Sequence, residues 1–302
     1  MIEIVGKYNT ALCYTNLIEP GAYSQILSVC NEEAFANCKI RIMPDVPEGK
    51  GCTIGTTMTI VDKVVPNMVG VDIGCGMYTV DLGKVDIDLE SFDEVAHTIP
   101  SGHGVWEGRL ERFDLKELRC FRNLKDTKRL ERSLGTLGGG NHFIEIDAAE
   151  DGTKYLVIHS GSRNLGTQVA MIYQGIALNL NLGKEEFYNR REEVIRTYKA
   201  DGRRGEIEET LKQMEREWRA KKPTMPRELC YLYGSFMEDY IHDIDVCQRF
   251  ATRNRQKMAE ILIDKAGLEA YVLENETVKE LIGGKPVRKL IAVPGSLVNI
   301  IC

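Results

Sequence analysis

The sequence lacks several features that would assign a function class directly. It has no Cys-x-x-Cys pair among its nine cysteines, and its formal net charge is −6, so no overall positive field indicates a nucleic-acid coat protein. It also has no apolar run long enough to span a bilayer, and its N-terminus lacks the basic and apolar segments of a signal peptide. We therefore expect a cytoplasmic protein with reduced thiols, most of them small buried hydrophobic side chains.

The length and composition are those of a globular protein. The 302 residues are 43% hydrophobic and 28% charged, and they contain no internal repeat. Short apolar runs bounded by glycine and proline at 39–46, 52–61 and 68–73 predict strands, and 143–160 predicts two strands around an acidic turn. We expect a single domain over residues 1–302 of the α+β class, in which mixed β-sheets of short strands present metal-ligand loops and helices surround them.

Helical patterns occupy much of the remaining sequence. Residues 23–36 and the highly charged segment 115–134 are helix-like, and 183–224 alternates charges with sparse apolar positions. We interpret 183–224 as an exposed insertion of two solvated helices that break at Asp201 and Gly202. Two core helices should follow, the first around residues 229–240 and the second from about 246 to 265. Residues 268–302 end on an apolar run and are expected to belong to a C-terminally incomplete chain.

Three glycine-rich motifs carry residues that could bind a metal ion. In VGVDIGCGM, Asp72 and Cys75 lie three apart in a tight loop, and a carboxylate with a thiolate can hold a divalent cation. In GTLGGGNHFIE, three glycines precede Asn141 and His142, and His142 begins a strand. In VIHSGSRNLG, an apolar strand leads to His159. Each motif alone could be an ordinary turn, and the donor types together leave Mn²⁺ and Zn²⁺ open.

The third motif also contains groups that bind phosphate. Ser160, Ser162 and Arg163 follow His159 directly, and hydroxyl, backbone N–H and guanidinium groups are common phosphate ligands. A weaker candidate is Lys50 in the loop MPDVPEGKG, which lacks the spacing of a Walker A loop. The histidines at 97, 103 and 242 are expected in surface loops or structural roles.

The motifs together resemble the RtcB family of RNA ligases. MPDV-x-x-GKG, VGVDIGCGM, GTLGGGNHF-x-E and HSGSRN-x-G occur in the family's order, and RFATRNRQKM is similar to a family helix. The resemblance implies a ligase of RNA repair and tRNA splicing. Such an enzyme joins a 2′,3′-cyclic phosphate or 3′-phosphate RNA end to a 5′-hydroxyl, with GTP and two Mn²⁺ ions. A histidine is guanylylated first, and GMP then passes to the RNA 3′-phosphate.

The resemblance also implies residue roles. Cys75 would bridge both metals, Asp72 and His142 would hold one side, and His159 would hold the other. Asn141 would contact guanylate or RNA phosphate, and residues 160–163 would line the path of the anion. Pro47 stands where the family's MPDV loop usually continues with histidine.

The activity of this chain alone is a separate question. The family's downstream His-Asn-Tyr and His-Gly-Ala-Gly-Arg segments, which supply a further ligand and the guanylylated histidine, have no counterpart here, since no histidine follows His242. Two alternatives therefore stay open beside the ligase. One is a metal-dependent phosphoesterase or cyclic phosphodiesterase, and the other is a catalytically inactive protein that binds metal and RNA ends.

Overall fold

The computed structural model describes residues 1–221, 223, 225–267, 289–293 and 297–301. The chain divides into two compact units, Met1–Gly70 with Ala170–Tyr240, and Val71–Val169 with Ile241–Cys302. Helices and several small sheets of both pairing directions make up the units, which confirms the predicted α+β class. Two helices, α5 (Arg163–Asn181) and α8 (Gly234–Lys265), contribute residues to both units.

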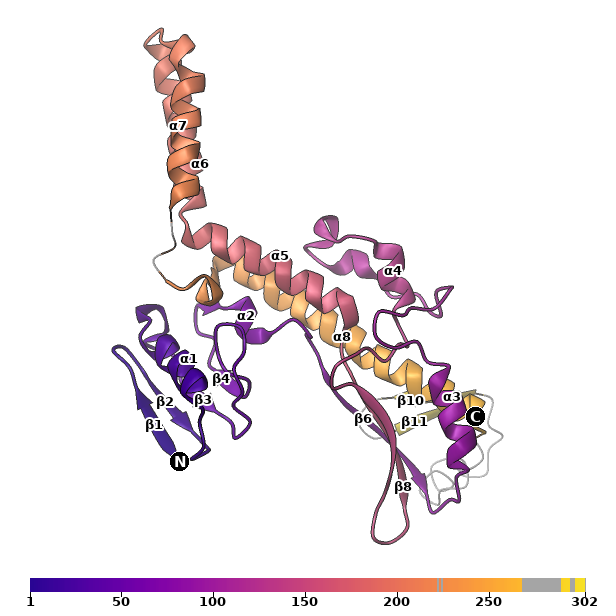
Figure 1. Ribbon diagram of the computed structural model, residues 1–302. Helices are drawn as coiled ribbons and strands as arrows, with labels where there is room; N and C mark the ends of the chain where they lie inside the picture. Colours follow the sequence, from indigo (N-terminus) through magenta and orange to yellow (C-terminus); the bar gives the residue numbers. More distant parts are fainter. Residues whose placement is uncertain (222, 224, 268–288, 294–296, 302) are drawn as a thin grey trace. The chain divides into compact units, whose positions relative to one another are not determined.

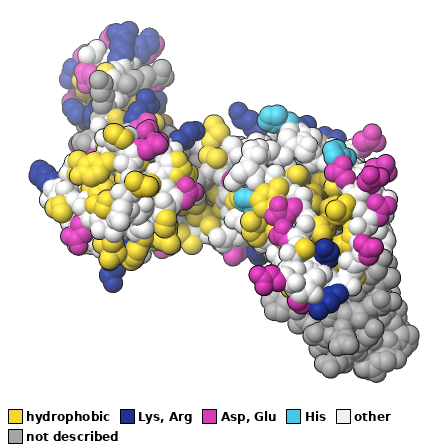
Figure 2. Space-filling view, turned by 60° about the horizontal axis from the view of Figure 1, so that its bottom comes forward, with side chains coloured by type: hydrophobic (Ala, Val, Ile, Leu, Met, Phe, Trp, Pro, Cys, Tyr) yellow, Lys and Arg dark blue, Asp and Glu magenta, His cyan; other side chains and the backbone are white. Residues whose placement is uncertain are grey.

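A four-stranded sheet is the main β structure of the first unit (Figure 1). Its strands lie in the order β1 (Ile2–Val5), β2 (Thr10–Cys13), β3 (Ile40–Ile42) and β4 (Thr56–Met58). Because β2 and β3 are parallel, a crossover must join them, and it contains α1 (Pro20–Cys30) and the 3-10 turn η1 (Glu33–Phe35). Some large apolar residues of this unit remain exposed; Leu17, for example, has an exposed fraction of 84%. Hydrophobic side chains are visible over this unit in Figure 2.

The rest of the first unit is mostly helical. The short strand β5 (Lys63–Val64) pairs with β9 (Leu232–Tyr233), and α2 (Pro66–Val69) and η5 (Arg227–Leu229) lie near this pair. Helices α6 (Lys184–Ala200) and α7 (Ile207–Ala220) form a hairpin through η4 (Arg204–Glu206), as Figure 1 shows. Phe187 stacks on Trp218 with ring centroids 5.3 Å apart. That this hairpin is an insertion stays a prediction.

The second unit is built on a three-stranded antiparallel sheet. Its order is β6 (Gly76–Gly83), β8 (Lys154–Ser160) and β7 (Phe143–Ala148), and β7 and β8 form the predicted hairpin around the acidic turn. The sheet packs against α3 (Leu89–His97) and α8 through one buried cluster, which includes Tyr78, Val80, Leu82, Phe92, Leu156, Ile158, Met258 and Leu262. Burial of this apolar surface holds the edge of the sheet from which the donor residues project.

Two helix predictions were wrong in detail. The charged segment 115–134 forms two 3-10 turns, η2 (Leu115–Glu117) and η3 (Phe121–Asn123), and one short helix, α4 (Thr127–Arg132). Asp114 and Asp126 each accept a hydrogen bond from a backbone N–H further along, and such caps start new turns instead of extending one helix. The two expected core helices are one, because residues 235–265 contain no glycine or proline to interrupt α8.

The C-terminal prediction falls largely outside the described residues. Residues 268–288, 294–296 and 302 are not described, and β10 (Lys289–Val293) and β11 (Leu297–Ile301) form an antiparallel pair. Among the described residues, no helix combines the length and the apolar character that crossing a bilayer requires.

Candidate metal centre

Three chain segments bring the predicted donors to one edge of the β6–β8–β7 sheet. Cys75 directly precedes β6, His142 directly precedes β7, and His159 is the penultimate residue of β8. The register places Met77 and Phe143 opposite His159 from either side, so the two strand starts and the strand end meet. Antiparallel pairing therefore gathers side chains that are up to 84 residues apart in sequence.

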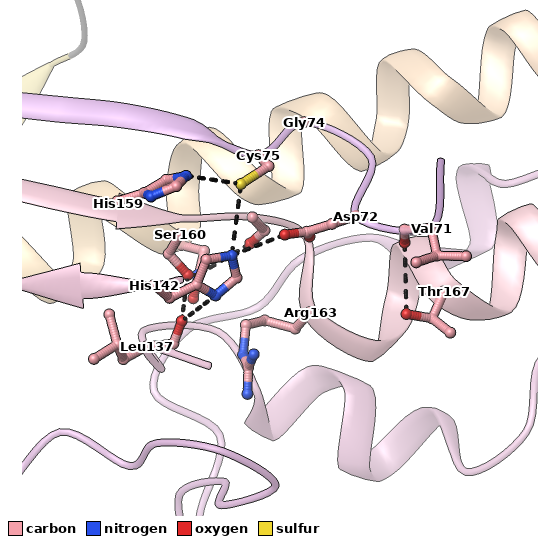
Figure 3. A network of polar contacts seen from close by, with 12 residues as sticks. Val71, Asp72, Gly74, Cys75, Leu137, His142, His159, Ser160, Arg163 and Thr167 are labelled. Carbon is pink, nitrogen blue, oxygen red and sulfur yellow. Dashed lines mark hydrogen bonds and ion pairs between the residues drawn. The ribbon is translucent and has the colours of Figure 1, made fainter. Parts of the chain in front are cut away.

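The donor atoms converge within contact distance (Figure 3). Cys75 Sγ lies 3.1 Å from His159 Nε2 and 3.5 Å from His142 Nε2, and His142 Nε2 lies 2.8 Å from Asp72 Oδ2. Ligand atoms held about 2.1–2.3 Å from a single divalent cation are roughly 3.0–3.6 Å apart in octahedral or tetrahedral geometry. The ligand atoms of Cys75, His142 and His159 all lie within 4.8 Å of one another, so these three side chains could share one ion. Asp72 adds a carboxylate oxygen in contact with His142.

The loop of residues 135–141, here called the glycine loop, sets the orientation of His142. Its Leu137 carbonyl accepts a hydrogen bond from His142 Nδ1 at 3.0 Å, which leaves Nε2 to face Asp72 and Cys75 as a metal-binding nitrogen. Gly138 has φ +105°, and a Cβ there would lie 2.3 Å from His142 Nδ1. Glycine is therefore required for the loop to pass this close to the imidazole ring.

The environment of Cys75 favours the protonated thiol when no cation is bound. Desolvation, followed by the negative charge of Asp72, raises the pKa of Cys75 to about 11, against opposing effects of Arg255 and a backbone N–H. The other described cysteines are buried, whereas Cys75 is exposed. A metal ion that binds here must displace the thiol proton. Its positive charge would then stabilise the thiolate, which the surrounding groups do not.

The residues predicted to bind phosphate occupy different environments. Arg163 lies beside the donors with φ +59°, and its Nη2 donates to the Gly102 carbonyl at 2.6 Å. Burial lowers the pKa of Arg163, and Asp72 opposes that effect. Asn141 is exposed next to His142. These positions leave Arg163 and Asn141 near the metal donors.

The two serines are fully buried. Ser160 Oγ donates to the Leu137 carbonyl at 2.6 Å, so it supports the glycine loop. Ser162 Oγ has no hydrogen-bond partner among the described residues. Lys50 belongs to the other compact unit, and the roles of Lys50 and both serines in phosphate binding stay predictions.

Two residues of α8 have a structural role at this site that the sequence reasoning missed. The Asn254 side chain accepts hydrogen bonds from the N–H groups of Gly135 and Thr136, and it donates to the Thr136 carbonyl, Ser160 Oγ and the Gly161 carbonyl. Arg255 Nη1 donates to the carbonyls of Gly74 and Ser160. The motif RFATRNRQKM contains both, but only the fold shows which loops they join.

The remaining histidines are not members of this donor group. His97 ends α3 and is exposed, and His103 lies in an exposed turn. His242 is inside α8, where its Nδ1 contacts Asp243 at 3.1 Å. Within the described part of the chain, the group of at least three donors close enough to share an ion is Cys75, His142 and His159.

Comparison with known proteins identifies the family of this chain. The family profile described as tRNA-splicing ligase RtcB matches residues 25–123 and 108–279. The RNA-splicing ligase RtcB of Escherichia coli K12 is 30% identical over 276 residues, which cover 82% of this chain and 57% of that protein. The tRNA-splicing ligase RtcB of Aeropyrum pernix is 29% identical over 193 residues, covering 44% of this chain and 39% of that protein. The matched part of the chain thus spans little more than half of the first relative and about two fifths of the second. It belongs to the RtcB family.

Proposed function

We propose that this chain supplies the metal-binding part of an RNA ligase. The reaction would join a 2′,3′-cyclic phosphate or 3′-phosphate RNA end to a 5′-hydroxyl end, with GTP and two Mn²⁺ ions and through a histidine–GMP intermediate. The names of the relatives, RNA-splicing and tRNA-splicing ligases, support this reaction class. The five histidines of the chain include no counterpart of the family's guanylylated histidine motif.

One observation carries the proposal. A carboxylate, a thiol and two imidazoles from three separate segments meet with donor-to-donor distances of 2.8, 3.1 and 3.5 Å. Divalent metal ions at such a site would neutralise charge that develops on phosphate oxygens during phosphoryl transfer. Mixed nitrogen, oxygen and sulfur donors on strand ends are more specific to metal binding than to a structural hydrogen-bond network, because the Cys75 thiol gains little from weak S–H bonds.

The distances support a role for each residue in binding the two ions and the phosphate. Cys75 lies between the two imidazoles, a position that suits a ligand shared by two ions. Asp72 and His142 contact each other and would hold one ion, while His159 would hold the second. Arg163 is positioned to bind and orient the phosphate of the RNA end, since a guanidinium can donate two parallel hydrogen bonds to it. Asn141 would contribute a further amide donor.

Metal binding by the unmodified chain is the direct test. Electron paramagnetic resonance of added Mn²⁺ should show bound ion in the wild type and a loss of at least tenfold in affinity in Cys75→Ala and His142→Ala. His97→Ala, which removes an exposed histidine remote from the donors, is the matched control and should bind as the wild type does. Equal Mn²⁺ affinity in all four proteins would refute the proposed site.

Reaction assays distinguish the ligase from its alternatives. With labelled GTP and Mn²⁺ we expect no stable covalent label on this chain, because the nucleophilic histidine motif is missing. A stoichiometric acid-labile label would show that one of the present histidines is guanylylated. Opening of an RNA 2′,3′-cyclic phosphate without GTP would instead favour the phosphodiesterase.

A further inference from the structure

A cavity of about 380 Å³ lies beside the metal donors, within the second unit. Asp72 and His142 line it on the side of the donors. The turn at 102–105, the α4 residues Arg129 and Leu130 with Ser133 just after that helix, and the start of α5 line most of the remainder. Small-molecule sites measure about 300–1,000 Å³, so the space is suited to one nucleotide-sized group. The cavity therefore extends the metal site in one direction, toward α4.

Two guanidinium groups line this cavity, and their charge is not neutralised. Arg163 Nη2 donates to the Gly102 carbonyl at 2.6 Å, and Arg129 Nη2 donates to the His103 carbonyl at 2.5 Å. Among the described residues neither arginine forms an ion pair, and Nη1 of each has no hydrogen-bond partner. Asp72 is the only acidic residue among those that line the cavity, and it is already assigned to the metal. The bonds to adjacent carbonyls hold both guanidiniums in place for an anion.

The surface that leads to Arg129 is basic although the whole chain is acidic. Residues 116–132 contain seven lysines and arginines against three aspartates and glutamates, whereas the net charge of the chain is −6. Of the three acidic side chains, Glu117 pairs with Arg249 and Asp126 caps α4. Lys125 and Lys128 are exposed beside Arg129. A local excess of positive charge next to the proposed site for an RNA end favours binding of a strand whose phosphates continue beyond that end.

We propose that Arg129 binds the phosphodiester next to the reacting end of a single-stranded RNA, while Arg163 binds the end itself. The inference rests on the proposed function, because it takes the metal donors as the place of the reacting phosphate. Arg129 lines the same cavity from α4 and is not one of the metal donors, so we assign to it the phosphate of the adjoining nucleotide. Val105, which is partly exposed, supplies apolar surface for the intervening sugar.

Two probes and two variants test this assignment. The probes are a fluorescent ten-nucleotide RNA with a 3′-phosphate and a nucleoside 3′-monophosphate, each titrated with the full chain and Mn²⁺. Arg129→Ala should weaken binding of the oligonucleotide about tenfold. It should also reduce the slope of log affinity against log salt concentration by about one, the value for one phosphate contact. Binding of the monophosphate should be unchanged. Arg129→Gln, which can still donate to the His103 carbonyl, should give the same result and excludes a folding defect.

The matched control is Lys84→Ala, which removes an exposed positive charge of the same unit at a residue that does not line the cavity. It should change oligonucleotide affinity by no more than about twofold. Equal losses in Lys84→Ala and Arg129→Ala, or a tenfold loss for the monophosphate, would overturn the assignment. Failure of the proposed function would be visible in the wild type as a lack of Mn²⁺-dependent RNA binding, and that result would overturn both.

Discussion

Asn254 offers the sharpest test of how this site is held together. Its side chain is fully buried; Oδ1 accepts two hydrogen bonds from the glycine loop, and the two protons of Nδ2 are shared among three acceptors, in residues 136, 160 and 161. A typical bond contributes about 1 kcal/mol net, and Asn254→Ala also leaves buried N–H and carbonyl groups without partners. We therefore expect the substitution to cost about 3–5 kcal/mol of the free energy that holds the loops in place.

Amide hydrogen exchange measures this local cost directly. In Asn254→Ala, the N–H groups of Gly135 and Thr136 should exchange about 100-fold faster or more, because about 3 kcal/mol of protection is lost. Mn²⁺ affinity should fall at least about tenfold, since the same loop orients the imidazole ligand His142. Asn123→Ala, at an exposed position of the same unit, is the control and should leave both quantities unchanged. If the Asn254 variant behaves like this control, the reasoning is wrong.

Three further predictions concern pH, a buried ion pair and a glycine. Without metal, the Cys75 thiol has a pKa of about 11, so its reaction with iodoacetamide should become about tenfold faster per pH unit from pH 7 upward. Mn²⁺ should suppress this labelling. A pH-independent rate would contradict the prediction. Burial acts to raise the pKa of Glu260, but its bonds to basic side chains of α8 outweigh burial and lower it. The carboxylate therefore stabilises the fold above its unfolded pKa of about 4.5 and loses that effect as pH falls through the lower folded value. The urea midpoints of wild type and Glu260→Gln should therefore converge as the pH is lowered below 4.5, and a constant difference would argue against this. Gly138→Ala should reduce Mn²⁺ affinity at least about tenfold because its Cβ would meet the imidazole ligand, whereas Gly152→Ala, also at positive φ but in open space, should not.

The sequence determined the donors and the local turns that present them. Asp72 and Cys75 lie in one loop, His142 follows three glycines, and His159 lies near the end of an apolar strand, so residue type and spacing pointed to them as candidate metal donors. The β7–β8 hairpin and the α+β class were also predictable, because the apolar runs and the acidic turn are local features. These properties depend on side chains within a few residues of each other.

The tertiary structure decided which of these residues share a site and what surrounds them. It placed Arg163 against the turn at Gly102, directed Ser160 into the protein, and used Asn254 to join loops that lie 93–119 residues away in sequence. The prediction of one helix at 115–134 also failed, because the side chains of Asp114 and Asp126 cap separate short turns there. A single sequence does not report such contacts, because each depends on the register of distant strands and not on the neighbouring residues.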